Sequence, residues 1–97
     1  MKNYPTGKEL ISLRETLCKD PAGMAALLAR TNEAYEELEK NGIRTSVDAR
    51  FTKQCLECYL KEGPYKEGTE QGIKDPETIL MVKERREVIQ AFVSRLG

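Results

Sequence analysis

The C-terminal stretch Asp75–Gly97, "DPETILMVKERREVIQAFVSRLG", decides the fold that the sequence predicts. Asp75 is a favourable N-cap and Pro76 suits the first helical position, so a helix is predicted from there. Its apolar residues cover about half of the helix circumference: Ile79, Met81, Val82, Val88, Ile89, Phe92, Val93 and Leu96. One neighbouring helix cannot cover so wide a face. We expect this helix to lie centrally in a bundle, contacted from two sides, with a homodimer through this last helix as the alternative.

Three further helices are predicted upstream, each with a side chain that can cap its first turn: Thr6, Asp20, and either Thr45 or Ser46. Gly42 and Gly63 can end the second and the third of these helices. The predicted boundaries are about 7–19, 21–41, 46–62 and 76–96. We therefore predict one all-α domain, residues 1–97, folded as a four-helix bundle with short connections between antiparallel neighbours.

The charge balance gives the chain no overall field that would draw it to nucleic acid or to an anionic membrane. Sixteen Lys and Arg side chains are matched by sixteen Asp and Glu, so the formal net charge is zero. No apolar run approaches the roughly 20 residues that cross a bilayer, and the N-terminal residues lack the apolar core of a signal peptide. The three cysteines are too few for a disulfide scaffold and fit a reducing compartment. We expect a cytoplasmic protein.

The absence of histidine narrows the chemistry more than any motif does. Without an imidazole there is no Ser-His or Cys-His nucleophile pair, no imidazole general base and no histidine ligand for a metal. No glycine-rich segment is followed by the Gly-Lys-Ser or Gly-Lys-Thr of a phosphate loop. We predict a protein that is not an enzyme and that holds no cofactor and no metal.

The stretch Lys53–Gly63, "KQCLECYLKEG", contains a Cys-x-x-Cys that could indicate a redox or a zinc site. Redox pairs of this kind follow a strand and lie at a helix N-terminus, whereas Cys55 and Cys58 fall well inside a predicted helix. A structural zinc ion needs four ligands, and Cys18 is the only other thiol. The helical period places both cysteines in one inward sector with the larger apolar residues of this helix: Val47, Phe51 and Tyr59. We therefore interpret both cysteines as core residues.

Residues 64–74, "PYKEGTEQGIK", form a connection that is long for a small bundle. Such a loop is either functional or mobile, so the alternatives are a binding loop and a flexible connector. On the following helix, Arg85 and Arg86 project into the apolar arc. An arginine there either packs its stem on apolar neighbours and extends its head to water, or binds a partner. The residues that we predict to bind a partner are Tyr65, Lys66, Arg85 and Arg86.

These features predict a small protein–protein interaction module, such as an adaptor, a regulator or an inhibitor of the immunity type, that acts through residues 64–74 and the last helix. The predicted partner is another protein. The alternative is a helix-turn-helix-like DNA-binding regulator whose helix 46–62 presents four polar side chains to DNA: Arg50, Lys53, Gln54 and Lys61. The neutral net charge, and Glu57 on the same face, count against DNA binding.

Overall fold

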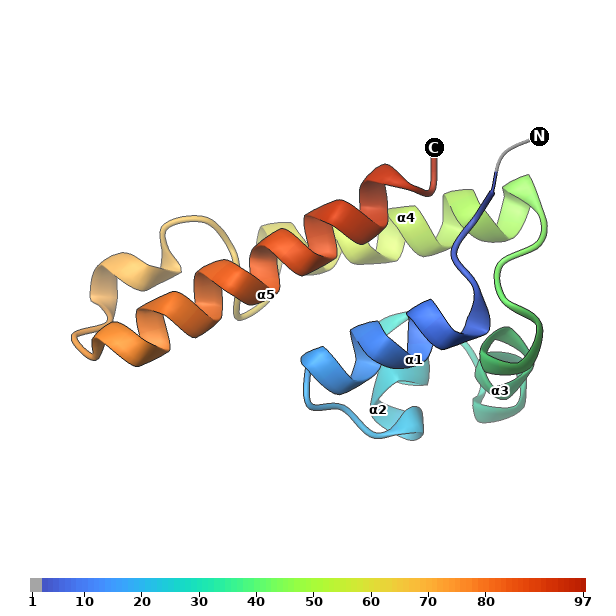
Figure 1. Ribbon diagram of the computed structural model, residues 1–97, viewed down its shortest axis with the longest axis horizontal. Helices are drawn as coiled ribbons and strands as arrows, with labels where there is room; N and C mark the ends of the chain where they lie inside the picture. The colour runs from blue at the N-terminus through green and yellow to red at the C-terminus, as the bar shows by residue number, and fades with distance from the viewer. Residues whose placement is uncertain (1–2) are drawn as a thin grey trace.

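The computed structural model describes residues 3–97, and within them the fold is all-α, as predicted. The range contains five α-helices and one short 3-10 helix and no strand. Figure 1 shows how these elements are arranged. The elements are α1 (Gly7–Thr16), α2 (Pro21–Leu27), α3 (Asn32–Asn41), α4 (Ser46–Glu62), the 3-10 helix η1 (Thr69–Gly72) and α5 (Pro76–Ser94). The predicted count of four helices is therefore wrong, and the predicted four-helix bundle is replaced by a five-helix arrangement.

The predicted helix 21–41 is two helices, because the chain turns between α2 and α3. Ala29 adopts the left-handed conformation, with a φ of 54°. The amide of Arg30 donates to the carbonyl of Ala25 at 2.9 Å, which is the long bond of a Schellman motif and ends α2. Sequence reasoning expects glycine at the left-handed position of this motif. An alanine there gives no signal, so the helix was predicted to continue.

The end of α1 has the same explanation. Cys18 also has a φ of 54°, and the same pair of backbone hydrogen bonds closes the turn after α1. This helix therefore ends at Thr16 rather than near residue 19. The new start at α3 is capped by Thr31, whose hydroxyl accepts a hydrogen bond from the amide of Ala34 at 3.1 Å. Both boundary errors arise where a left-handed residue other than glycine ends a helix.

The last helix, α5, is contacted by two helices, α1 and α4, rather than by one. The three short helices contact one another through α1–α3 and α2–α3 packing, and α2 also reaches α4. Figure 1 shows them together beside the long α4–α5 pair. The end of that pair that carries η1 extends beyond the short helices, in a molecule that measures 41 × 27 × 20 Å.

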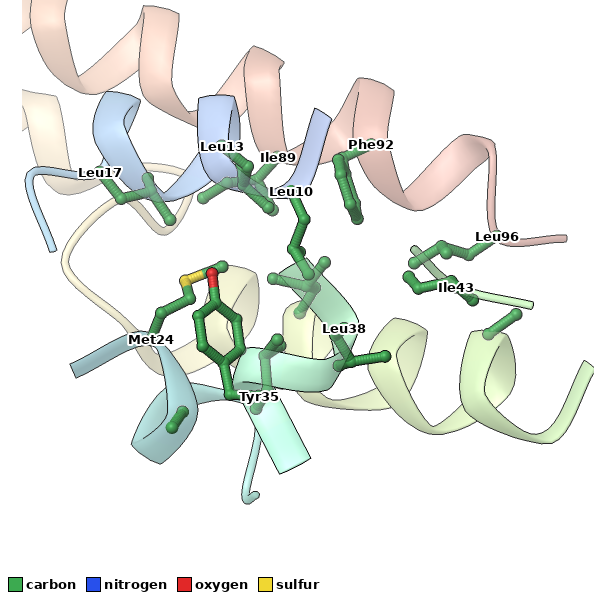
Figure 2. Close-up of a cluster of buried hydrophobic side chains, with 14 of the residues drawn as sticks. Leu10, Leu13, Leu17, Met24, Tyr35, Leu38, Ile43, Ile89, Phe92 and Leu96 are labelled. Carbon is green, nitrogen blue, oxygen red and sulfur yellow. The ribbon is translucent and has the colours of Figure 1, made fainter. Parts of the chain in front are cut away.

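All five α-helices contribute buried apolar side chains to one core. Figure 2 shows the leucines of α1 close to residues of α5 above them and of α2 and α3 below them. The fully enclosed members include Leu10, Met24, Leu28, Tyr35, Leu56 and Ile89, each 0% exposed. Because α1 packs against both α3 and α5, it joins the two halves of the fold.

The N-terminal segment crosses the end of α3 at a contact between backbones. The amide of Ile43 donates to the carbonyl of Pro5 at 3.0 Å. Gly42 caps α3 with a φ of 75°, which glycine adopts without steric cost. At Gly7, a Cβ atom would lie only 1.9 Å from the carbonyl oxygen of Glu39. Glycine is therefore required at position 7 for α1 and α3 to approach this closely.

Candidate protein-binding site

The loop between α4 and α5 is held to α5 by one arginine. The Nε of Arg86 donates to the carbonyl oxygen of Tyr65 at 2.7 Å, and its Nη2 donates to that of Lys66 at 2.8 Å. The same guanidinium binds the carboxylate of Glu70 in a bidentate pair, at 2.7 and 2.8 Å. We call this set of contacts the arginine clamp. It satisfies two loop carbonyls and one loop carboxylate with a single planar side chain, a role that lysine cannot fill.

A second arginine fixes the aromatic residue of the loop. The Nη1 of Arg85 donates to the hydroxyl of Tyr65 at 2.7 Å, and its guanidinium carbon lies 5.5 Å from the centre of that ring. The ring also meets Tyr59 of α4 edge-on, with 6.0 Å between centroids. Arg85 further donates to the sulfur of Cys18 at 3.2 Å. Tyr65 is thereby attached to α4, α5 and the end of α1.

The structure brings the four predicted binding residues into one cluster, but gives them unequal exposure. Tyr65 is buried, Arg85 and Arg86 are half-buried and bonded within the chain, and Lys66 has an exposed side chain. Tyr65 is thus a core residue rather than a surface one. The interpretation of residues 64–74 as a flexible connector fails at the clamp, because residues 65, 66 and 70 are bonded to α5. Partner binding by the four residues stays a prediction.

The clamped loop and the first turn of α5 form a protruding end that we call the tip, residues 64–80. Figure 1 shows η1 and the start of α5 at the end of the molecule away from α1, α2 and α3. Leu80 is 58% exposed there, which is more than any other leucine or isoleucine of the described residues. Ile73 and Ile79 are half-buried nearby in the sequence, and Lys66 and Lys74 are exposed. The tip is the part of the chain in which a preformed loop and an exposed leucine occur together.

The electrostatics of the clamp depend on Glu70. Hydrogen bonds from Arg86 lower the pKa of this carboxyl from 4.5 to about 2. The amide of Gly68, at 3.0 Å from the carboxylate, acts in the same direction. Conversely, the bond to Glu70 raises the pKa of Arg86. Sequence reasoning missed Glu70, although an arginine in an apolar arc requires an acceptor and this loop contains two glutamates.

We expect the clamp to open in acid. Because the pKa of Glu70 is lower in the folded chain, its contribution to stability is complete above pH 4.5 and is lost as the pH falls towards about 2. Amide hydrogen exchange, corrected for the intrinsic pH dependence, should show protection of residues 65–72 falling over this interval. In Glu70→Gln, loop protection should be low at neutral pH and change little on acidification. The role of Glu70 would be contradicted if the wild-type loop kept its protection from exchange at pH 2. It would also be contradicted if the loop of Glu70→Gln were as protected at neutral pH as that of the wild type.

The prediction that both cysteines lie in the core holds only in part. Cys55 is half-buried and packs against the core cluster. Cys58 is exposed, with its thiol 3.8 Å from the carboxylate of Glu62, so the prediction is wrong for this residue. The buried residues of α4 are Ala49, Thr52 and Leu56, so the helix is turned by about a third of a circle from the predicted orientation. Two apolar residues predicted to face inward are exposed: Val47 (73%) and Phe51 (40%). The helical period found an apolar face of α4, but not the face that packs on α5.

Burial and the neighbouring Cys58 raise the pKa of the Cys55 thiol, while Arg30 acts in the opposite direction. This keeps Cys55 in the protonated form, which is the less reactive one. Within residues 3–97, no three cysteine, aspartate or glutamate side chains gather in a way that could hold a metal ion.

An uncharged face covers α2 and the adjoining side of α4. Residues 21–29, "PAGMAALLA", contain no charge in a chain of which 33% is charged. Their exposed members are Pro21, Ala22, Ala26 and Ala29, and the face continues over Val47, Phe51 and Cys58 of α4. A groove of about 450 Å³ lies along this face. Most of its lining is uncharged, including Gly23, Ala26, Leu27, Cys55, Cys58 and Tyr59, but Lys19 and Glu62 also line it. The charge-free run was visible in the sequence, but its exposure was not.

The residues of the DNA-binding alternative lie on the other edge of α4. Arg50, Gln54 and Lys61 are exposed, Lys53 is half-buried, and Glu57 is exposed among them. In a helix-turn-helix the first helix supports the second, yet here α3 packs against α1 and α2, while α4 packs against α5 and α2. DNA binding stays a prediction, without a contact that favours it.

None of the helices within the described residues has the length and apolar character that a bilayer crossing requires. No protein-family model, no curated protein and no solved structure matches this chain.

Proposed function

We propose that this protein is a non-enzymatic protein–protein interaction module, acting as an adaptor, regulator or inhibitor, that contacts its partner through the tip. The observation that supports the proposal is the arginine clamp. It holds residues 65, 66 and 70 in one conformation by four hydrogen bonds from Arg86. Loops that carry function are commonly positioned by a rigid scaffold, and here α5 is that scaffold.

A fixed loop is an advantage in binding because its ordering cost is met during folding rather than during association. The polar clamp does not bury much apolar surface, so it sets the shape of the loop more than it adds to the core. Beside it, Leu80 is exposed and offers an apolar side chain to a partner. We infer a division of roles: Arg85, Arg86 and Tyr65 position the loop, while Lys66 and Leu80 touch the partner.

The test is affinity capture from the native host with quantitative mass spectrometry. The wild type is compared with a tip variant, Lys66→Glu with Leu80→Asp, and with a matched control, Lys40→Glu with Val88→Asp. All four substituted positions are exposed, so folding should be retained, as checked by thermal melting. We expect a protein that is recovered by the wild type and the control and is reduced about tenfold or more with the tip variant.

Two outcomes would contradict the proposal. One is that no protein is enriched above bare resin, or that every enriched protein survives the tip substitutions. The other is recovery of duplex DNA that is lost with Arg50→Glu and Lys61→Glu and that falls steeply with salt, which would support the DNA-binding alternative instead.

A further inference from the structure

The outward side of α4 carries the residue spacing of a coiled-coil seam without a partner helix in the chain. Four residues of α4 are spaced by four, three and four positions, which is the spacing of the alternating core positions in a heptad: Phe51, Cys55, Cys58 and Glu62. Phe51 and Cys58 are exposed and Cys55 is half-buried. Beside this seam, the exposed residues of α2 are the small and uncharged Pro21, Ala22 and Ala26, and the half-buried Leu27 also lines the groove, so another helix could approach α4.

We propose that a second copy of this chain occupies the uncharged face, with its α4 antiparallel to this α4, to form a symmetric dimer. In an antiparallel pair of heptads, each a position of one helix faces a d position of the other helix. Phe51 then lies opposite the partner subunit's Glu62, and Cys55 lies opposite the partner subunit's Cys58. The dimer uses a face other than the tip, so it does not depend on the proposed function and leaves the tip exposed.

The charges at the two ends of the seam select this occupant and this orientation. At one end, the guanidinium of Arg30 lies 5.2 Å from the centre of the Phe51 ring. It makes one ion pair, from Nη2 to Asp48 at 3.2 Å, and its side chain is 15% exposed. Its Nε is buried without an acceptor, so only the terminal nitrogens could meet a partner. At the other end, Glu62 is exposed, and its one hydrogen bond among the described residues comes from the weak thiol donor of Cys58.

An antiparallel copy brings Glu62 of each chain to Arg30 of the other. A parallel copy would set Glu62 against Glu62 and Arg30 against Arg30, which like charges disfavour. The chain therefore contains both halves of a complementary pair at the two ends of one seam, with Lys19 lining the same groove as Glu62. A specific dimer needs about 500 Å² from each partner. That is a small part of the 6266 Å² that each chain exposes.

The first test exchanges the charges and measures association by sedimentation equilibrium. Glu62→Arg alone and Arg30→Glu alone should each raise the dimer dissociation constant about tenfold or more, because each places like charges at both ends of the dimer. Mixed in equal amounts, the two variants should form a heterodimer, since both ends are then complementary again. Thermal melting of each variant checks that it is folded. A mixture that associates no better than the separate variants would overturn the proposal.

The second test needs no charge change. Two variants are compared, and both carry Cys18→Ser. One also carries Cys55→Ser and retains only Cys58, and the other also carries Cys58→Ser and retains only Cys55. A short bismaleimide, which alkylates two thiols by addition, should link the equal mixture more than either variant alone. Equal linking in all three samples would contradict the register.

Three other results would overturn the proposal. The first is a wild type that stays monomeric up to about 1 mM, the concentration scale of the weakest specific complexes. The second is a dimer that Val88→Asp on α5 disrupts but Glu62→Arg does not. The third is a different protein that occupies this face of a monomeric chain. A dimer that Val88→Asp disrupts would favour the homodimer through the last helix.

Discussion

Replacing Gly7 with alanine is expected to destabilise the protein by about 3 kcal/mol, the upper part of the range for overpacking. The added Cβ would lie 1.9 Å from the carbonyl oxygen of Glu39 and 2.7 Å from its carbonyl carbon. These are backbone atoms, so the clash cannot be relieved by rotating a side chain. Alanine has the higher helix propensity, but that gain of about 1 kcal/mol is smaller than the clash.

The matched control for this substitution is Gly72→Ala. No atom lies within 4 Å of a Cβ built on Gly72, and its φ is not positive. We expect its free energy of unfolding to stay within about 0.5 kcal/mol of the wild-type value. Chemical denaturation of both variants makes the comparison. If Gly7→Ala were as stable as Gly72→Ala, the close crossing of α1 and the end of α3 would be wrong.

Replacing Arg86 with methionine is expected to release the tip while the rest of the fold remains. Methionine keeps an apolar stem but donates no hydrogen bond, so the carbonyls of Tyr65 and Lys66 and the carboxylate of Glu70 lose the hydrogen bonds that Arg86 donates. The loss of such bonds costs about 1–3 kcal/mol. Hydrogen exchange with mass spectrometry should show residues 65–72 exchanging about tenfold faster or more, with α1–α3 little changed.

Arg95→Met is the control for that experiment. Arg95 also forms an ion pair, with Glu9, but both side chains are substantially exposed, at 44% and 39%. Such surface pairs contribute about 0–1 kcal/mol, so this variant should leave exchange at residues 65–72 at the wild-type rate. A loop that exchanges equally in Arg86→Met and Arg95→Met would show that the clamp does not hold it.

The starts of four of the five α-helices could be predicted from the sequence because they depend on nearby residues, whereas the start of α3 after Thr31 was missed. Thr6, Asp20, Thr45 and Asp75 each accept a hydrogen bond from the amide three residues on, as their side chains predict. The ends of α1 and α2 could not be predicted. They depend on Cys18 and Ala29 taking a conformation that neither residue favours, which tertiary packing imposes.

The orientation of α4 could not be predicted because its two apolar faces compete. One face carries the apolar residues Val47 and Phe51, and the other carries the small residues Ala49 and Thr52 together with Leu56. Helical periodicity favours the first, whereas the helix buries the second against its neighbours. Small residues allow closer packing between helices, and hydrophobicity alone does not measure that.

The candidate site was predicted in part. The sequence identified Arg85 and Arg86 as exceptional, because charged side chains in an apolar arc need an explanation. It could not identify what they bind, because Tyr65 and Glu70 lie in an irregular loop. The path of that loop depends on the same hydrogen bonds, from Arg85 to Tyr65 and from Arg86 to Glu70. Loop contacts of this kind depend on geometry across many residues, which periodicity does not contain.

The position of α1 between α3 and α5 has a consequence for the order of folding. Leu10 and Leu13 pack in a core that includes Ile89 and Phe92, residues near the opposite end of the chain. During synthesis, α1, α2 and α3 leave the ribosome before α5 exists, so an apolar side of α1 stays open until α5 docks. Contacts between such distant segments also slow folding. The nascent chain must therefore keep this surface from aggregating until its last helix arrives.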